Sequence, residues 1–98
     1  MKISKTLNGG TLTIALEGRL DTTTAPEAEK EISGSLGGVN ELVMDFAKLD
    51  YISSAGLRVL LSANKAMMNR GGMKVIHVNE VVMEVFEVTG FVDILSIE

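Results

Sequence analysis

The chain has 98 residues, of which 46% are apolar and 22% charged, and its formal net charge at pH 7 is −4. This length and mixture are typical of one globular domain and exclude a disordered segment. The excess of acidic residues, without a cluster of Lys and Arg, argues against nucleic-acid binding. The absence of cysteine excludes disulfides and thiolate metal sites, and no run approaches the ~20 apolar residues of a membrane span. We therefore expect a cytoplasmic protein that binds neither nucleic acid nor membrane.

The beginning of the chain predicts a β-hairpin. Residues 2–7 and 11–17 alternate between polar and apolar side chains, as strands do. Residues 8–10, Asn-Gly-Gly, separate them and favour a tight turn, because Asn and Gly tolerate positive φ. Residues 18–21 are expected to leave the sheet.

A helix and a buried strand are expected next. The helix begins within residues 22–27, where a Thr can act as the cap and Pro26 suits the first turn, and it runs to about Leu36. Residues 41–46 form a short apolar strand. Residues 47–50 are expected to be a connection.

The second half predicts further alternation of helix and strand. Helical spacing of apolar residues covers 54–69, a strand follows at 73–78, and Asn79 can cap a helix over 80–88. The valines of that last helix favour a strand, but its glutamates at spacings of 4 and 3 and the glycine after it favour a helix. A short strand is possible within 93–97. Strands separated by helices imply parallel neighbours and right-handed crossovers, and hence one α/β domain over the whole chain.

Few side chains are suited to catalysis. The glycine pairs do not form a phosphate-binding loop, and no G-x-S-x-G motif is present. His77 is the only histidine, and its place in an apolar run predicts a partly buried side chain with no role as base or ligand. Asp21, Asp45 and Asp50 are either metal carboxylates or, as we favour, turn residues that accept hydrogen bonds from nearby amides. We expect no enzyme activity, no metal and no cofactor.

The helix predicted over residues 54–69 has two different sides. Its polar stripe consists of Ser54, Arg58, Ser62, Lys65 and Asn69. Its buried side is expected to contain Leu57, Leu60, Leu61 and Met68. Ser54 therefore lies at the head of a solvent-facing ridge. A hydroxyl in that place can cap the helix, or it can be phosphorylated on an exposed surface, and the residues alone leave both interpretations open.

Several segments together resemble the STAS domain family, specifically the bacterial anti-sigma-factor antagonists. Met44-Asp45-Phe46 and the stretch Leu49-Asp50-Tyr51-Ile52-Ser53-Ser54-Ala55-Gly56-Leu57-Arg58-Val59-Leu60-Leu61 are similar to the family signature. The other similar segments, in chain order, are Leu16-Glu17-Gly18-Arg19-Leu20-Asp21 with Thr24-Ala25, Gly71-Gly72-Met73, and Val85-Phe86-Glu87-Val88-Thr89-Gly90-Phe91. The resemblance covers nearly the full chain and implies a small mixed sheet of four or five strands, with about three helices packed beside it.

The resemblance also implies a function. Such proteins bind an anti-sigma-factor serine kinase and so release the sigma factor, until the kinase phosphorylates a serine at the start of the second helix; a serine phosphatase reverses this. In the family that serine stands two positions before the Gly of a Gly-Leu pair, which here is Ser54. Ser53, where family members often have Asp, is the alternative. The partner-binding residues expected in this chain are Asp21, Thr22, Asp50, Ser53, Ser54, Gly56, Arg58, Ser62 and Lys65.

Two other functions are compatible with the same fold. The chain could be a STAS-type scaffold in another signalling assembly, or it could bind a small ligand or nucleotide near the strand ends. We expect a monomer in each case.

Overall fold

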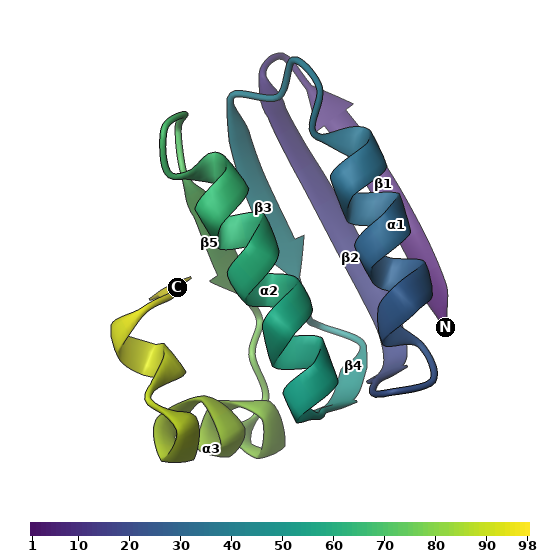
Figure 1. Ribbon diagram of the computed structural model, residues 1–98, viewed down its shortest axis with the longest axis vertical. Helices are drawn as coiled ribbons and strands as arrows, with labels where there is room; N and C mark the ends of the chain where they lie inside the picture. Colours follow the sequence, from purple (N-terminus) through teal and green to yellow (C-terminus); the bar gives the residue numbers. More distant parts are fainter.

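The second strand is the longest, and the sheet is built around it. In chain order the elements of the computed structural model, which describes all 98 residues, are β1 (Lys2–Asn8), β2 (Thr11–Leu20), α1 (Ala25–Ser35), β3 (Glu41–Asp45), β4 (Leu49–Ile52), α2 (Ser54–Met67), β5 (Met73–Ile76), α3 (Glu80–Thr89), a 3-10 turn (Phe91–Asp93) and β6 (Ser96–Ile97). β1 pairs antiparallel with β2, and all other pairs are parallel. The strand order is β1-β2-β3-β5-β6, with β4 beside the end of β2 (Figure 1). The predicted α/β class with a mixed sheet is confirmed.

The region around β4 differs from the sequence prediction. β2 does not leave the sheet at residue 18 but continues to Leu20, and residues 49–52 are a strand and not part of a connection. The register of β2 against β4 shifts between Gly18 and Arg19, and Gly18 has a φ of 99°, which glycine adopts without steric cost. One half of β2 therefore pairs with β3 and the other half with β4. The sheet has six strands for this reason, where four or five were expected.

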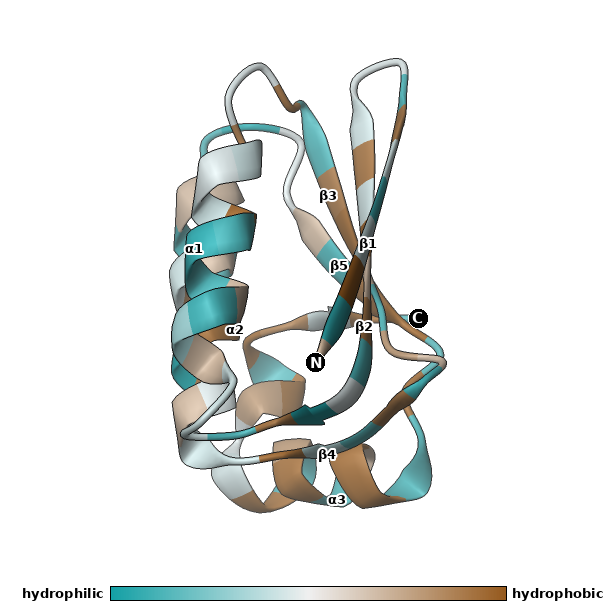
Figure 2. Ribbon diagram, turned by 90° about the vertical axis from the view of Figure 1, so that its right-hand side faces the viewer, coloured by the Kyte–Doolittle hydropathy of each residue, from teal (hydrophilic) through white to brown (hydrophobic).

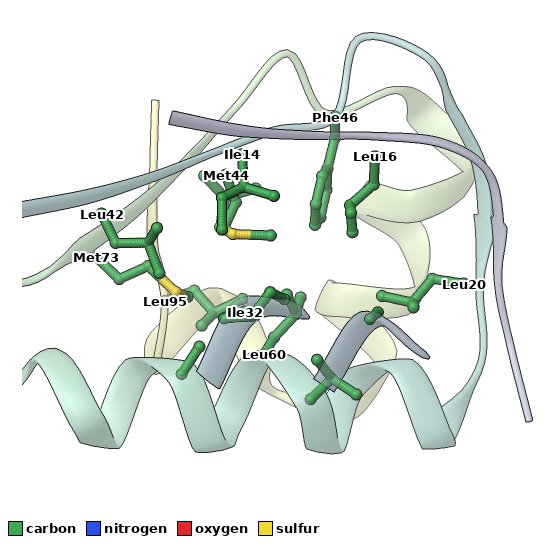
Figure 3. Packing of buried hydrophobic residues seen from close by; sticks show 14 of the residues in the cluster. Ile14, Leu16, Leu20, Ile32, Leu42, Met44, Phe46, Leu60, Met73 and Leu95 are labelled. Carbon is green, nitrogen blue, oxygen red and sulfur yellow. The ribbon is translucent and has the colours of Figure 1, made fainter. Parts of the chain in front are cut away.

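Helices α1 and α2 lie side by side on one face of the sheet, and α3 lies across its lower end (Figure 2). The core is the layer between the sheet and these helices. Figure 3 shows Ile14, Met44 and Phe46 of the sheet layer pointing toward Ile32 of α1 and Leu60 of α2. Complete burial of side chains of this size stabilises the fold by about 1.5–3 kcal/mol each. No helix is both long and apolar enough to cross a lipid bilayer.

The buried side of α2 differs from the prediction at its last turn. Met67 is fully buried, whereas Met68, predicted to be buried, is 69% exposed. Met67 follows Leu60 by seven residues, which is about two helical turns, so the two side chains share one face. Met68 is rotated by about 100° from that face.

Helix α3 forms as predicted despite its valines. The Asn79 side chain caps it by accepting a hydrogen bond from the Val82 amide at 2.8 Å. Gly90 ends it in the left-handed conformation, with a φ of 81°. Val82 and Phe86, four residues apart, are buried in the core. The cap and this burial outweigh the strand propensity of the valines.

The histidine is not partly buried, as the sequence predicted, but is exposed. The strand expected over residues 73–78 ends at Ile76, because His77 adopts a φ of 58°. The His77 side chain is 62% exposed, and its Nδ1 lies 2.9 Å from Asp45 Oδ1. Burial raises the pKa of Asp45, but the hydrogen bonds from His77 and from the Ala47 amide, together with the charge of His77, outweigh this effect, so the pKa lies below the usual value of 3.8.

Candidate partner-binding surface

The two adjacent serines at the start of α2 differ in accessibility. Ser54 is the first residue of the helix and is exposed. Ser53 is the N-cap residue, but its side chain makes no capping hydrogen bond. Its Oγ is buried and has no hydrogen-bond partner. Only the Ser54 hydroxyl is therefore open to a partner.

A close contact between α2 and β2 determines where this helix begins. The Ser53 amide donates to the Leu20 carbonyl at 2.9 Å, which joins the residue before α2 to the end of β2. A Cβ placed on Gly56 would lie 2.8 Å from that same carbonyl oxygen and 2.7 Å from Cγ1 of Ile52. Only glycine allows the first turn to approach the strand so closely. Gly56 is buried, and it contributes to this packing between α2 and β2.

The loop after β2 is ordered by hydrogen bonds centred on Asp21. Its Oδ1 accepts from the amides of Thr23 at 3.0 Å and Thr24 at 3.2 Å. The Thr24 hydroxyl accepts from the Asp21 amide at 2.9 Å and donates to the Arg19 carbonyl at 2.7 Å. The Thr24 amide is the main cause that lowers the pKa of Asp21, and the Thr23 amide and Arg19 add to it. Asp21 is thus an ionised group in an ordered loop.

Two residues of this surface were missed by sequence reasoning. Arg19 lies 3.4 Å from Asp21 Oδ2, measured from its Nε. Its guanidinium also lies over the Tyr51 ring, 4.5 Å from the centroid, a cation–π distance. The pairing of Arg19 with Tyr51 across β2 and β4 brings the two together. No sequence signal joined them, because the sequence predicts no strand at residues 49–52 that could pair with β2.

The predicted partner-binding residues fall into three groups by accessibility. The exposed ones are Thr22, Asp50, Ser54, Arg58, Ser62 and Lys65. Asp21 and Ser53 are partly buried, and Gly56 is buried. Lys65 lies eleven residues after Ser54, a rise of about 16 Å along the helix, so the polar stripe runs from the loop of Asp21 to the far end of α2. All predicted members of the stripe are exposed.

A shallow groove between α1 and α2 adjoins the stripe. Its lining residues are Glu29, Ile32, Ser33, Leu36, Val59, Ser62, Ala63 and Ala66. Ser62 therefore belongs both to the stripe and to this groove, which extends the accessible surface toward α1.

The three aspartates do not form a metal site. Asp21 and Asp45 accept hydrogen bonds from the amides two or three residues after them, as predicted for turn residues. The same prediction is wrong for Asp50, which lies within β4 and is exposed. No group of three or more His, Cys, Asp or Glu side chains lies close enough together to hold a metal ion.

Comparison with known proteins identifies the fold and the family. A sequence model of the STAS domain matches residues 2–98. A Bordetella bronchiseptica protein that bears the name of an anti-sigma factor antagonist, BtrV, is 34% identical over 99 residues, which cover 99% of this chain and 85% of that protein. Two solved structures are similar in fold. An anti-sigma factor antagonist from Mycobacterium paratuberculosis has a TM-score of 0.90 at 20% identity, over 98% of this chain and 83% of that one. The Bacillus cell fate determinant SpoIIAA in its phosphorylated form has a TM-score of 0.75 at 19% identity, over 99% and 91%. The chain therefore belongs to the STAS domain family, among its anti-sigma factor antagonists.

Proposed function

We propose that this protein binds an anti-sigma-factor serine kinase, thereby releases the sigma factor, and loses that binding when Ser54 is phosphorylated. The observation that carries the proposal is the exposed Ser54 hydroxyl at the head of α2, next to a Ser53 hydroxyl that is buried. A serine phosphatase restores the active form. The protein itself acts as a regulator and not as a catalyst. Residues 1–98 form one STAS domain that carries this function.

The proposed switch is local. A phosphoryl group adds about −1.5 to −2 charges at pH 7. At the first residue of α2 this charge is favoured by the free amides and the dipole of the helix, and Arg58, one turn further on, is exposed and makes no ion pair in the free protein. The helix therefore survives the modification. What changes is the partner contact, because a hydrated dianion within it adds about 1–3 kcal/mol of desolvation and repulsion. Each 1.4 kcal/mol lowers the affinity about tenfold.

The remaining surface follows from the accessibility of each residue. We assign the contacts with the kinase to Asp21, Thr22, Asp50, Ser54, Arg58, Ser62 and Lys65. Ser53 and Gly56 support this surface from beneath: Ser53 through its backbone and Gly56 through its close packing on Leu20.

The first test is phosphorylation of the purified chain by its kinase with labelled ATP. We expect one phosphate per chain, which Ser54→Ala abolishes and Ser53→Ala leaves in place, because only the Ser54 hydroxyl is accessible. Mass spectrometry of the peptide that contains residue 54 locates the label. Label that persists in Ser54→Ala and disappears in Ser53→Ala would move the site to Ser53.

The second test measures whether a negative charge at residue 54 weakens binding of the kinase. Ser54→Asp should weaken kinase binding in titration calorimetry by about tenfold or more, whereas Ser4→Asp, which adds the same charge on exposed β1, should not. Circular dichroism should show the same helix content for both variants. Equal affinities of the two variants would contradict the electrostatic part of the proposal.

Two further experiments separate the alternatives. Mass spectrometry of proteins captured by the chain distinguishes a sigma-factor regulator from a scaffold of another assembly. A thermal-shift screen with nucleotides tests the ligand-binding alternative, because a ligand of the native state raises the melting temperature.

A further inference from the structure

Helix α3 has an apolar ridge of three valines, of which the two at its ends are exposed and the middle one packs partly against the core. Val81 is 53% exposed and Val88 is 80% exposed, and Val85 between them is partly exposed. Their spacings of 4 and 3 place the three valines on one side of the helix. The core-facing residues Val82 and Phe86 lie on a different side. Apolar residues therefore occur on two sides of α3, whose ribbon is largely brown in Figure 2.

An acidic row follows this valine ridge along the same helix. Glu80, Glu84 and Glu87 are exposed, repeat the spacings of 4 and 3, and form no ion pair. Together with Val78, Asn79 and Met83 they line a hollow on the surface.

The charge of the chain is divided unevenly around this helix. Residues 75–98 contain five acidic residues and no Lys or Arg, while residues 1–74 contain nine basic and eight acidic residues. The whole net negative charge of the protein is therefore concentrated in the segment that carries the exposed valines.

We propose that the valine ridge and acidic row of α3 form a second docking surface, for a partner protein's amphipathic helix whose apolar side is flanked by Lys and Arg. The valines would bury against the apolar side of that helix, and the unpaired glutamates would meet its cations. Complementary charge of this kind accelerates association and selects the partner.

The acidic row argues against the other possible occupants. A second copy of the chain would place glutamates against glutamates, which is unfavourable. An anionic membrane surface would repel the same carboxylates.

The α3 surface lies near the start of α2 but shares no residue with the polar stripe. Asn79 Nδ2 donates to the Leu49 carbonyl at 2.8 Å and so holds α3 against β4, at the same end of the molecule as the start of α2 (Figure 1). Because the proposed switch changes only the charge at residue 54, we expect the α3 surface to bind its partner whether or not Ser54 is phosphorylated. The proposal thus goes beyond the partner switch.

The test is a titration of the full-length, ¹⁵N-labelled protein with a synthetic helical peptide that has Leu on one side and Lys on the other. We expect saturable amide shifts centred on α3, and affinity that falls as NaCl is raised. Val88→Ser should weaken binding by about tenfold, since it removes most of one exposed apolar contact. The matched control Met68→Ser removes another exposed apolar side chain, at the C-terminal end of α2, and should leave the affinity unchanged.

The charge of the acidic row is tested in the same way. Glu84→Gln should weaken peptide binding, whereas Glu29→Gln, exposed on α1, should not. A Leu/Lys peptide of scrambled order, which has no apolar side, should bind poorly.

Three results would overturn the proposal. Shifts spread over all acidic surfaces, or no saturable binding, would show that α3 is not a docking surface. Equal effects of Val88→Ser and Met68→Ser would show the same. Self-association in light scattering that Val88→Ser abolishes would identify a second copy as the occupant. Ser54→Asp should bind the peptide like the unmodified protein, so failure here leaves the kinase proposal standing.

Discussion

The absence of a side chain at Gly56 lets the start of α2, and with it the candidate site, lie close to the end of β2. We expect Gly56→Ala to destabilise the protein by about 1–3 kcal/mol, because the added Cβ would lie 2.8 Å from the Leu20 carbonyl oxygen, a backbone atom that cannot move aside cheaply. This cost outweighs the gain of about 1 kcal/mol in helix propensity. Urea unfolding measures the difference.

Gly34 provides the matched control, since it also lies within a helix. A Cβ there would meet nothing within 4 Å, so Gly34→Ala should stabilise the protein by about 0.5–1 kcal/mol. Effects of the same sign at both positions would contradict the close-packing explanation.

The elements are held together at their ends as well as through the core. Arg70, just after α2, donates from one guanidinium nitrogen to the carbonyls of Leu36 and Val39, which follow α1. A cation at a helix C-terminus also interacts favourably with the helix dipole. Arg70→Met should therefore reduce the free energy of unfolding by about 1–2 kcal/mol. Arg58→Met, which removes an exposed guanidinium without a partner, should change it by less than about 0.5 kcal/mol; an equal loss would show that Arg70 does not hold α1.

The stability of the whole molecule should depend on pH through Asp45, at the end of β3, and its contact with His77, just after β5. The pKa of Asp45 is lower in the folded chain than its usual value of 3.8, so the ionised form stabilises the fold. This contribution is fully present above about pH 5 and is lost as the pH falls through 3.8 and below. Asp45→Asn should therefore reduce stability at pH 6 more than at pH 3. Thermal unfolding across this range checks the expectation, with Asp50→Asn as the control for a lost exposed charge. Equal losses at both pH values would contradict the role of Asp45.

At every scale, some features could be predicted from the sequence because their causes lie within one or two turns of chain. The hairpin at residues 8–10, the three helices and the exposed polar stripe of α2 follow from turn residues, caps and apolar spacing. The helical spacing of polar residues in α2 is enough to predict that Ser54 faces solvent, and the structure confirms that it is exposed.

Other features depended on residues that are distant in sequence, and only the tertiary structure decided them. β4 exists as a strand because β2 is long enough to pair with it beyond Gly18. The Ser53 hydroxyl is buried because Gly56 lets α2 approach Leu20, and Arg70 holds a helix that ends 35 residues earlier. Local backbone preference and periodicity determine which segments become helices or strands and which side faces inward. Packing between those segments determines which of two adjacent hydroxyls a partner can reach, because that depends on atoms no local pattern brings together.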